Sequence, residues 1–218
     1  MPIPHSWNIS PEDAVRLQAE LAPRIDTTTP LNPDAIRYVA GVDVSVKDGQ
    51  SRAAIVVLRF PELEIIEAQS AHIATPFPYI PGLLSFREGE VILRAQADLQ
   101  YMPDVYLFDG MGIMHPRRLG IASHMGLWLD APTIGIGKKR LLGRYEAPPN
   151  EKGSFSPLAQ GGETLGVVLR TRANVKPVFV SVGHKATLDT TIDFVLRCTP
   201  QYRLPEPIRA AHKHAGRL

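Results

Sequence analysis

The stretch RYVAGVDVSVKDGQSRAAIVVLRF, from Arg37 to Phe60, decides the fold class of this chain. Its first part alternates apolar with polar residues, the Asp48-Gly49 dipeptide is typical of a turn, and the second part is another β-rich run. We therefore expect a β-hairpin over residues 37–59. The run EIIEAQSAHI at residues 64–73 is expected to add a third strand beside it.

Helical and strand segments alternate after these strands. Apolar residues at helical spacing predict helices over about residues 83–99 and 117–129, and short apolar runs predict strands at DVYLFDG and PTIGIGK. Three consecutive strands followed by helix, strand, helix and strand indicate an α/β fold of a particular topology. The strands that alternate with helices are expected to be parallel.

The second half of the chain continues the pattern without a domain boundary. TLGVVLR and PVFVSVG are expected to be strands, and TLDTTIDFVLRC a helix with Thr187 as its N-cap. Residues 147–162 are rich in Pro, Gly, Asn and Ser and predict a surface loop. No internal repeat is visible, so we expect a single domain over residues 1–218.

Both ends of the chain carry predicted helices. Ser10 followed by proline and two acids is a strong helix start, and this helix is expected to reach about Ala22 within an N-terminal extension of residues 1–30. A proline-rich lead and the run LPEPIRAAHKHA predict a C-terminal helix within residues 205–218.

Composition limits the classes of protein to which the chain can belong. At 218 residues and 44% hydrophobic residues it can bury a core of its own. The sequence has no signal-peptide pattern, and its longest apolar run, AAIVVL from Ala53, is far too short to span a membrane. The single cysteine, Cys198, excludes an internal disulfide and a thiolate zinc site. We therefore expect a cytoplasmic protein without a membrane partner, in which Cys198 is inert packing.

Basic residues gather in two segments although the net charge is only +2. If the two segments share a face, that face would attract phosphates, whereas the alternative is that these residues only solvate loops and a helix. The first segment contains Arg117, Arg118, Lys138, Lys139, Arg140 and Arg144, and the second contains Arg197, Arg203, Arg209, Lys213 and Arg217.

Three acidic residues are expected to converge on one place. Asp43 lies inside an apolar strand, where a carboxylate is costly unless it is paired or bound to a metal. Asp109 lies at the C-terminal end of VYLFD, where sites form in parallel sheets. Glu88 shares helical spacing with the apolar residues that face the sheet.

Three converging carboxylates imply a cation, because their mutual repulsion would otherwise be strong. Oxygen ligands without thiols favour Mg²⁺ or Mn²⁺ over zinc. Each acid also has a structural alternative. Asp109-Gly110 is an ordinary turn dipeptide, Glu88 is at capping-box distance from Ser85, and Asp43 could form a local hydrogen bond.

Six motifs, in order along the chain, resemble those of the endonuclease V family. They are GVDVS around Asp43, PYIPGLLSFREGE, FDGMGIMHPRRLGIASHMG, GIGKKRLLG, SVGHKATLDTTI and YRLPEPIRAAH. The resemblance covers residues from about Arg37 to His212. It implies a ribonuclease H-like mixed sheet, with three antiparallel strands followed by parallel strands and with helices on both faces.

The resemblance also implies an activity. The chain would be a Mg²⁺-dependent DNA repair endonuclease that recognises deaminated bases, chiefly inosine (hypoxanthine). It would nick the strand at the second phosphodiester bond 3′ of the lesion and leave 3′-hydroxyl and 5′-phosphate ends. A monomer is expected independently of the resemblance, as the default for a compact domain with no obvious interface stripe. Mn²⁺ would substitute for Mg²⁺.

Residue roles follow from the same resemblance. Asp43, Glu88 and Asp109 would be catalytic and hold the metal, Lys138 would contact a phosphate, and His212 would lie near the attacking or metal-bound water. The stiff PYIP segment would wedge into the duplex in place of the flipped-out base. Substrate contacts would come from Pro78, Tyr79, Ile80, Pro81, Gly82, Leu84, Gly110, Gly112, His115, Gly120 and Ile121.

The sequence departs from the family pattern at two motifs, and other functions stay open. Met111 stands where a polar residue is common, and GIGKK replaces a GVAKS type. His115, Arg117 and Arg118 are interpreted as contacts to the DNA backbone, and His184 as a residue that orders a loop. The alternatives are an inosine-specific ribonuclease, a structure-selective ribonuclease H-like nuclease, a lesion-binding protein without catalysis and a sugar-kinase-like or actin-like ATPase.

Overall fold

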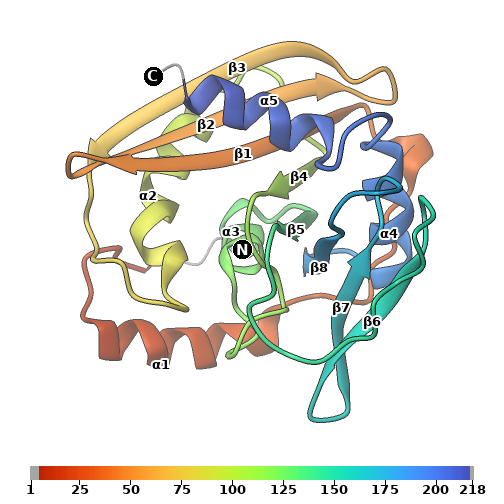
Figure 1. The fold of residues 1–218 in the computed structure, drawn as a ribbon. Helices are drawn as coiled ribbons and strands as arrows, with labels where there is room; N and C mark the ends of the chain where they lie inside the picture. Colours follow the sequence, from red (N-terminus) through yellow and green to blue (C-terminus); the bar gives the residue numbers. More distant parts are fainter. Residues whose placement is uncertain (1–4, 217–218) are drawn as a thin grey trace.

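The predicted hairpin lies within one eight-stranded sheet (Figure 1). The computed structural model describes residues 5–216. The strands are β1 (Tyr38–Lys47), β2 (Gln50–Arg59), β3 (Glu64–Ala74), β4 (Val105–Phe108), β5 (Thr133–Gly137), β6 (Phe155–Gln160), β7 (Glu163–Leu169) and β8 (Val178–His184). The helices are α1 (Pro11–Leu21), α2 (Leu84–Ala97), α3 (Ile121–Leu129), α4 (Leu188–Arg197) and α5 (Glu206–Ala215), with short 3₁₀ helices η1 (Ala22–Arg24) and η2 (Pro33–Ala35).

The strands follow the order β3-β2-β1-β4-β5-β8-β7-β6 across the sheet. β1, β2 and β3 are antiparallel, and β4 and β5 continue the sheet parallel to β1. Asp48 and Gly49 have φ values of 51° and 71° and form the two-residue turn between β1 and β2, a turn that needs positive φ at both positions. The predicted α/β class and mixed sheet are confirmed.

Different helices cover the two faces of the sheet. Successive side chains of a strand point to opposite faces, so neighbouring residues of β1 pack against different helices. Ala40 and Val42 of β1 pack in one core cluster with residues of α2 and α3. Val39 packs in another cluster with residues of α4 and α5. Asp43 within β1 and Asp109 directly after β4 therefore belong to the centre of a sheet that helices support on both faces.

Three details of the structure correct the predictions. α3 begins at Ile121 rather than Arg117, because Arg118 has a left-handed φ of 59° and helical geometry starts only after Gly120. β6 lies inside the stretch predicted as a loop, and its alternating burial from Phe155 onward explains why it pairs. Beyond β5 the sheet is antiparallel, since β8 pairs antiparallel with β5 and β7 with β8.

The terminal helices begin close to the predicted residues. Ser10 Oγ accepts a hydrogen bond from the Asp13 amide at 3.1 Å, as an N-cap does. Thr187 precedes α4, but its hydroxyl contacts Thr190 Oγ1 instead of a helix amide. Residues 1–4 and 217–218, which belong to the predicted N-terminal extension and C-terminal helix, lie outside the described residues. Between residues 5 and 216, no helix has the length and apolar character needed to cross a membrane.

Candidate active site

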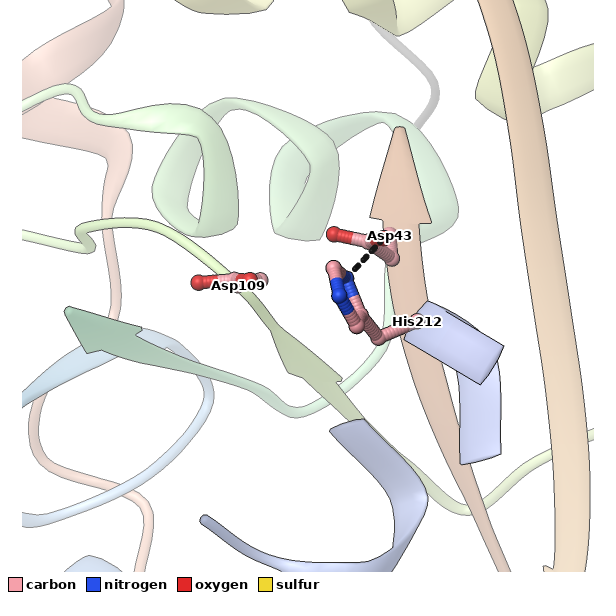
Figure 2. A group of neighbouring side chains, drawn as sticks. All are labelled: Asp43, Asp109 and His212. Carbon is pink, nitrogen blue, oxygen red and sulfur yellow. Dashed lines mark hydrogen bonds and ion pairs between the residues drawn. The ribbon is translucent and has the colours of Figure 1, made fainter. Parts of the chain in front are cut away.

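The parallel pairing of β1 and β4 brings two of the predicted acids together. Val42 is the register partner of Phe108, so Asp43 and Asp109 follow at neighbouring strand positions. The Asp109 amide donates to the Val42 carbonyl at 3.2 Å and extends the ladder by one bond. Figure 2 shows the two carboxylates on adjacent strands. Their proximity is therefore a consequence of main-chain pairing.

His212 reaches the same place from α5. Its Nδ1 lies 3.1 Å from Asp43 Oδ2, as the dashed line in Figure 2 marks. One ligand atom from each of Asp43, Asp109 and His212 lies within 4.8 Å of the others. Two carboxylates and an imidazole at this spacing form a donor set suited to a divalent cation.

Glu88 of α2 lines the same hollow, which has a volume of about 330 Å³, together with Asp43, Asp109, Lys138 and His212. It is not among the three residues whose ligand atoms lie within 4.8 Å. Burial, with the charge of Asp43 next, raises the pKa of Glu88 to about 8. The structure thus brings all three predicted acids to one hollow, and the raised pKa favours a protonated Glu88 at neutral pH when no cation is bound.

The electrostatics of this hollow favour a cation. Burial, followed by the charge of Asp109, raises the pKa of Asp43, although the hydrogen bond to His212 opposes the shift. Lys138 Nζ donates to Asp109 Oδ2 and provides a positive charge beside the acids. A bound divalent cation would add positive charge at the point where the carboxylates are most crowded.

A second and larger pocket, of about 590 Å³, opens beside the acidic hollow. The two share Leu84, Asp109, Ile121 and Lys138 as walls. The predicted substrate contacts that line this pocket are Tyr79, Ile80, Pro81, Gly82, Leu84, Gly110, His115, Gly120 and Ile121. Met111, the departure from the family pattern, lines it as well. A group seated in this pocket would therefore lie next to Asp109.

The carbonyl of Gly82 fixes one wall of the pocket. It accepts hydrogen bonds from Gln18 Nε2 at 2.9 Å, from His115 Nε2 at 3.1 Å and from Arg117 at 2.8 Å. Burial, together with the charge of Arg117, lowers the pKa of His115 to about 4, so this histidine is neutral and donates through Nε2. Gly82 itself has a φ of 81°, a conformation that glycine adopts without strain.

Tyr79 projects from the loop that Gly82 ends. Its side chain is 71% exposed, and the guanidinium of Arg87 lies 5.8 Å from the centre of its ring. Leu83 donates to the Ile80 carbonyl at 3.0 Å, which closes the loop behind the tyrosine. The loop therefore exposes an aromatic side chain while a main-chain hydrogen bond closes the loop behind it.

Two predicted substrate contacts do not line the pocket. Pro78 is exposed on the outer side of the loop, and neither hollow includes it. Gly112 lies against β8, where a Cβ atom would be only 1.9 Å from the Val182 carbonyl oxygen. Its need for glycine comes from close strand packing rather than from the approach of a ligand.

Three of the basic residues donate hydrogen bonds within the protein. Arg117 donates to Gln18 and Gly82, and Arg118 donates to Glu163 and the His115 carbonyl, while their contacts to the DNA backbone stay a prediction. Arg203 donates to the Lys138 carbonyl at 2.9 Å. The two basic segments therefore meet beside the acidic hollow.

Sequence reasoning missed Gln18, which is 1% exposed and comes from α1. Its Nε2 binds the carbonyls of Gly82 and Leu119, at 2.9 and 3.0 Å. A glutamine in an amphipathic helix carries no signal of such a role. His184 accepts from the Asp26 amide at 3.1 Å, which agrees with its predicted ordering of a loop, and Cys198 is buried as predicted.

The sequence of this chain is similar to those of one known family. The family model described as Endonuclease V matches residues 19–213. The chain is 53% identical over 214 residues to Endonuclease V of Nostoc punctiforme, which covers 97% of this chain and 96% of that protein.

Solved structures agree with this match. The crystal structure of Endonuclease V from Streptomyces avermitilis has a TM-score of 0.93 at 41% identity and covers 99% of this chain and 96% of that one. Ciona intestinalis Endonuclease V, in complex with a 24mer DNA containing an inosine followed by a ribo-adenosine, has a TM-score of 0.81 at 28% identity, covering 94% and 96%. The chain belongs to the endonuclease V family, and it is a nuclease, a hydrolase that acts on DNA.

Proposed function

We propose that this nuclease is a DNA repair endonuclease that recognises deaminated bases, chiefly inosine. It nicks the strand at the second phosphodiester bond 3′ of the lesion and leaves 3′-hydroxyl and 5′-phosphate ends. The observation that carries the proposal is the common wall of the two hollows: Asp109 and Lys138 face both the acidic cluster and the larger pocket. A base held in that pocket puts its own strand beside the acids.

Asp43, Glu88 and Asp109 are the proposed metal-binding residues. Their oxygen donors suit Mg²⁺, with Mn²⁺ as a substitute, and a bound ion would supply Lewis acidity toward the phosphate and lower the pKa of a water. His212 holds Asp43 in place through its Nδ1 and is set to orient the attacking water. Lys138 is set to exchange its contact with Asp109 for a phosphate oxygen near the cut.

The larger pocket is the proposed site of the flipped-out base. Its volume of about 590 Å³ and its apolar and glycine walls suit a planar purine. The exposed Tyr79 would fill the gap left in the base stack, because a tyrosine on a stiff loop loses little conformational entropy when it inserts. The endonuclease V of Ciona intestinalis was solved in complex with DNA that contains an inosine, which supports inosine as the base recognised.

A single-turnover nicking assay tests the proposal. End-labelled duplexes that differ only by one inosine are incubated with the enzyme and Mg²⁺, beside an RNA strand with the same inosine. A cut at the second phosphodiester bond 3′ of inosine, absent from the control duplex, is the expected result. Equal cutting of both duplexes would reject lesion recognition, and faster cutting of the RNA would make the enzyme an inosine-specific ribonuclease.

The cytoplasmic location and monomeric action predicted from the sequence belong to the same proposal.

A further inference from the structure

A chain of buried and partly buried hydrogen bonds joins the amino-terminal segment to the start of α2. Trp128 Nε1 lies 2.9 Å from His5 Nε2, His5 Nε2 lies 2.8 Å from His124 Nε2, and His124 Nδ1 lies 2.8 Å from Ser85 Oγ. We call these four residues the His5 clasp. It joins a segment before α1, two residues of α3 and the second residue of α2.

The direction of every hydrogen bond in the clasp follows from one donor. The Trp128 indole can only donate, so His5 Nε2 must accept, and His5 Nδ1 donates to the Ser6 carbonyl at 3.0 Å. His124 Nε2 must then carry a proton, and it shares the single lone pair of His5 Nε2 with the indole N–H. Its Nδ1 is left as the acceptor for the Ser85 hydroxyl, and burial lowers the pKa of His124 to about 3, in agreement with a neutral ring.

Trp7 seals the clasp against α2. Its ring packs where a Cβ atom on Gly89 would lie 2.2 Å away, so only glycine permits this approach. The rings of Trp7 and Trp128 stack with centroids 5.4 Å apart. Burial lowers the pKa of His5, which agrees with a neutral acceptor inside this aromatic cluster.

The clasp ends at the larger pocket. Ser85 lines that pocket, and so do Gly120 and Ile121 at the start of α3. Leu84 and Ser85 begin α2, and Ile121 begins α3, so the pocket lies between the two helix starts. The separation of these helix starts therefore helps to set the shape of the pocket.

On the basis of the proposed function, we propose that the His5 clasp positions the start of α2 against the start of α3 and thereby sets the fit of the pocket for the flipped-out base. His5, His124 and Trp128 are positioning residues, since they act on the pocket through Ser85 and through helix packing. The amino-terminal segment is accordingly part of the lesion-recognition apparatus.

A pair of substitutions at His5 tests the clasp. His5→Leu removes the acceptor and leaves the His124 and Trp128 donors unpaired, whereas the side-chain oxygen of His5→Gln can accept from both. We expect His5→Leu to raise KM for the inosine duplex about tenfold with kcat within about twofold of wild type. His5→Gln should keep KM within about threefold of wild type.

Two controls separate positioning from loss of stability. Phe194→Leu weakens the core on the opposite face of the sheet, far from the pocket, and should lower the melting temperature without changing KM. The sequence contains only two tryptophans, Trp7 and Trp128, and both lie in or against the clasp, so intrinsic fluorescence reports whether it is closed.

The outcomes are distinct. A raised KM in His5→Leu that His5→Gln restores, with altered fluorescence only in His5→Leu, supports the clasp. An unchanged KM in His5→Leu despite altered fluorescence overturns it, and so does an equal rise of KM in Phe194→Leu. Wild-type enzyme that cuts the inosine and control duplexes equally would overturn the proposed function instead.

Discussion

The acidic hollow and the larger pocket are neighbours with a common wall, but they are built in opposite ways. The acidic hollow brings three carboxyl groups together, and burial raises the pKa values of two of them, Asp43 and Glu88. The pocket consists largely of glycine, apolar side chains and loop backbone that buried polar groups hold in place. The first arrangement stores electrostatic repulsion that a cation relieves, and the second keeps one shape.

This difference teaches where each kind of substitution should act. Changes to the acidic hollow should alter the rate of cutting and the response to metal, with little effect on binding. Changes to the pocket and its supports should alter binding, with little effect on the rate at saturation. A variant that alters both together would break the comparison.

Asp43→Asn is expected to have the largest effect, because Asp43 lines only the acidic hollow. The loss of a charged ligand should lower the single-turnover nicking rate by at least about 10³-fold. Binding of an inosine duplex in Ca²⁺, measured by fluorescence anisotropy, should stay within a few-fold of wild type. Asp193→Asn, at an exposed ion pair on α4, is the control and should cut normally. Loss of binding in Asp43→Asn would show that the acidic hollow also contributes to DNA binding, so that the two hollows do not have separate roles.

Gln18→Leu should act on the pocket alone. It removes the hydrogen-bond partner that Gln18 provides for the Leu119 carbonyl and the Arg117 Nε, at a cost of about 1–3 kcal/mol per buried group. We expect KM for the inosine duplex to rise about tenfold while the rate at saturation is kept. Gln69→Leu on β3 removes a glutamine hydrogen bond away from the pocket and serves as the control. A fall in the saturated rate with unchanged KM would contradict the division.

Glu88→Gln should change how the free energy of unfolding depends on pH. The folded-state pKa of Glu88 is about 8, above its ordinary value of 4.5, so the folded protein binds this proton more tightly than the unfolded chain. The resulting stabilisation is complete below pH 4.5 and is lost as the pH rises through about 8.

In EDTA, wild-type protein should therefore lose about 3 kcal/mol of unfolding free energy between pH 5.5 and 8 that Glu88→Gln does not lose. Urea unfolding at the two pH values measures this, and added Mg²⁺ should stabilise wild type more at pH 8. Parallel pH profiles for the two proteins would show that Glu88 titrates elsewhere.

Tyr79→Ala should have the smallest effect. Its side chain is largely exposed, so the unfolding free energy should change by no more than about 0.5 kcal/mol. Loss of stacking should weaken binding of the inosine duplex about fivefold. Tyr101→Ala, at another exposed tyrosine, controls for general loss of aromatic surface and should bind normally. Equal binding by both variants would remove Tyr79 from the recognition apparatus.

The acidic hollow was the more predictable of the two from sequence. Asp43 and Asp109 stand out because each is a charged residue in an apolar strand context, and parallel neighbours bring such residues together. Glu88 follows from helical spacing. The resemblance named His212 as a site residue, but its hydrogen bond to Asp43 depends on how α5 packs across the sheet and could not be predicted from sequence.

The pocket was harder to predict, because backbone and distant partners build it. Gln18 acts on carbonyls at positions 82 and 119, and no local pattern couples such distant residues. Gly112, which was predicted to contact the substrate and does not line the pocket, shows a related difficulty. Close strand packing and close approach of a ligand both require glycine, and only the structure distinguishes them. β6 was missed because its proline and flanking glycines resemble a loop.

The bond from the Asp109 amide to the Val42 carbonyl has a consequence for redesign. The spacing of Asp43 and Asp109 is set by the sheet ladder, whereas the lesion is held by loops and helix starts on the other side of Asp109. An engineer could therefore rebuild the loops around Met111 to accept a different modified base and leave the cutting chemistry untouched. The sheet would keep the metal-binding acids in place while the loops that recognise the base are exchanged.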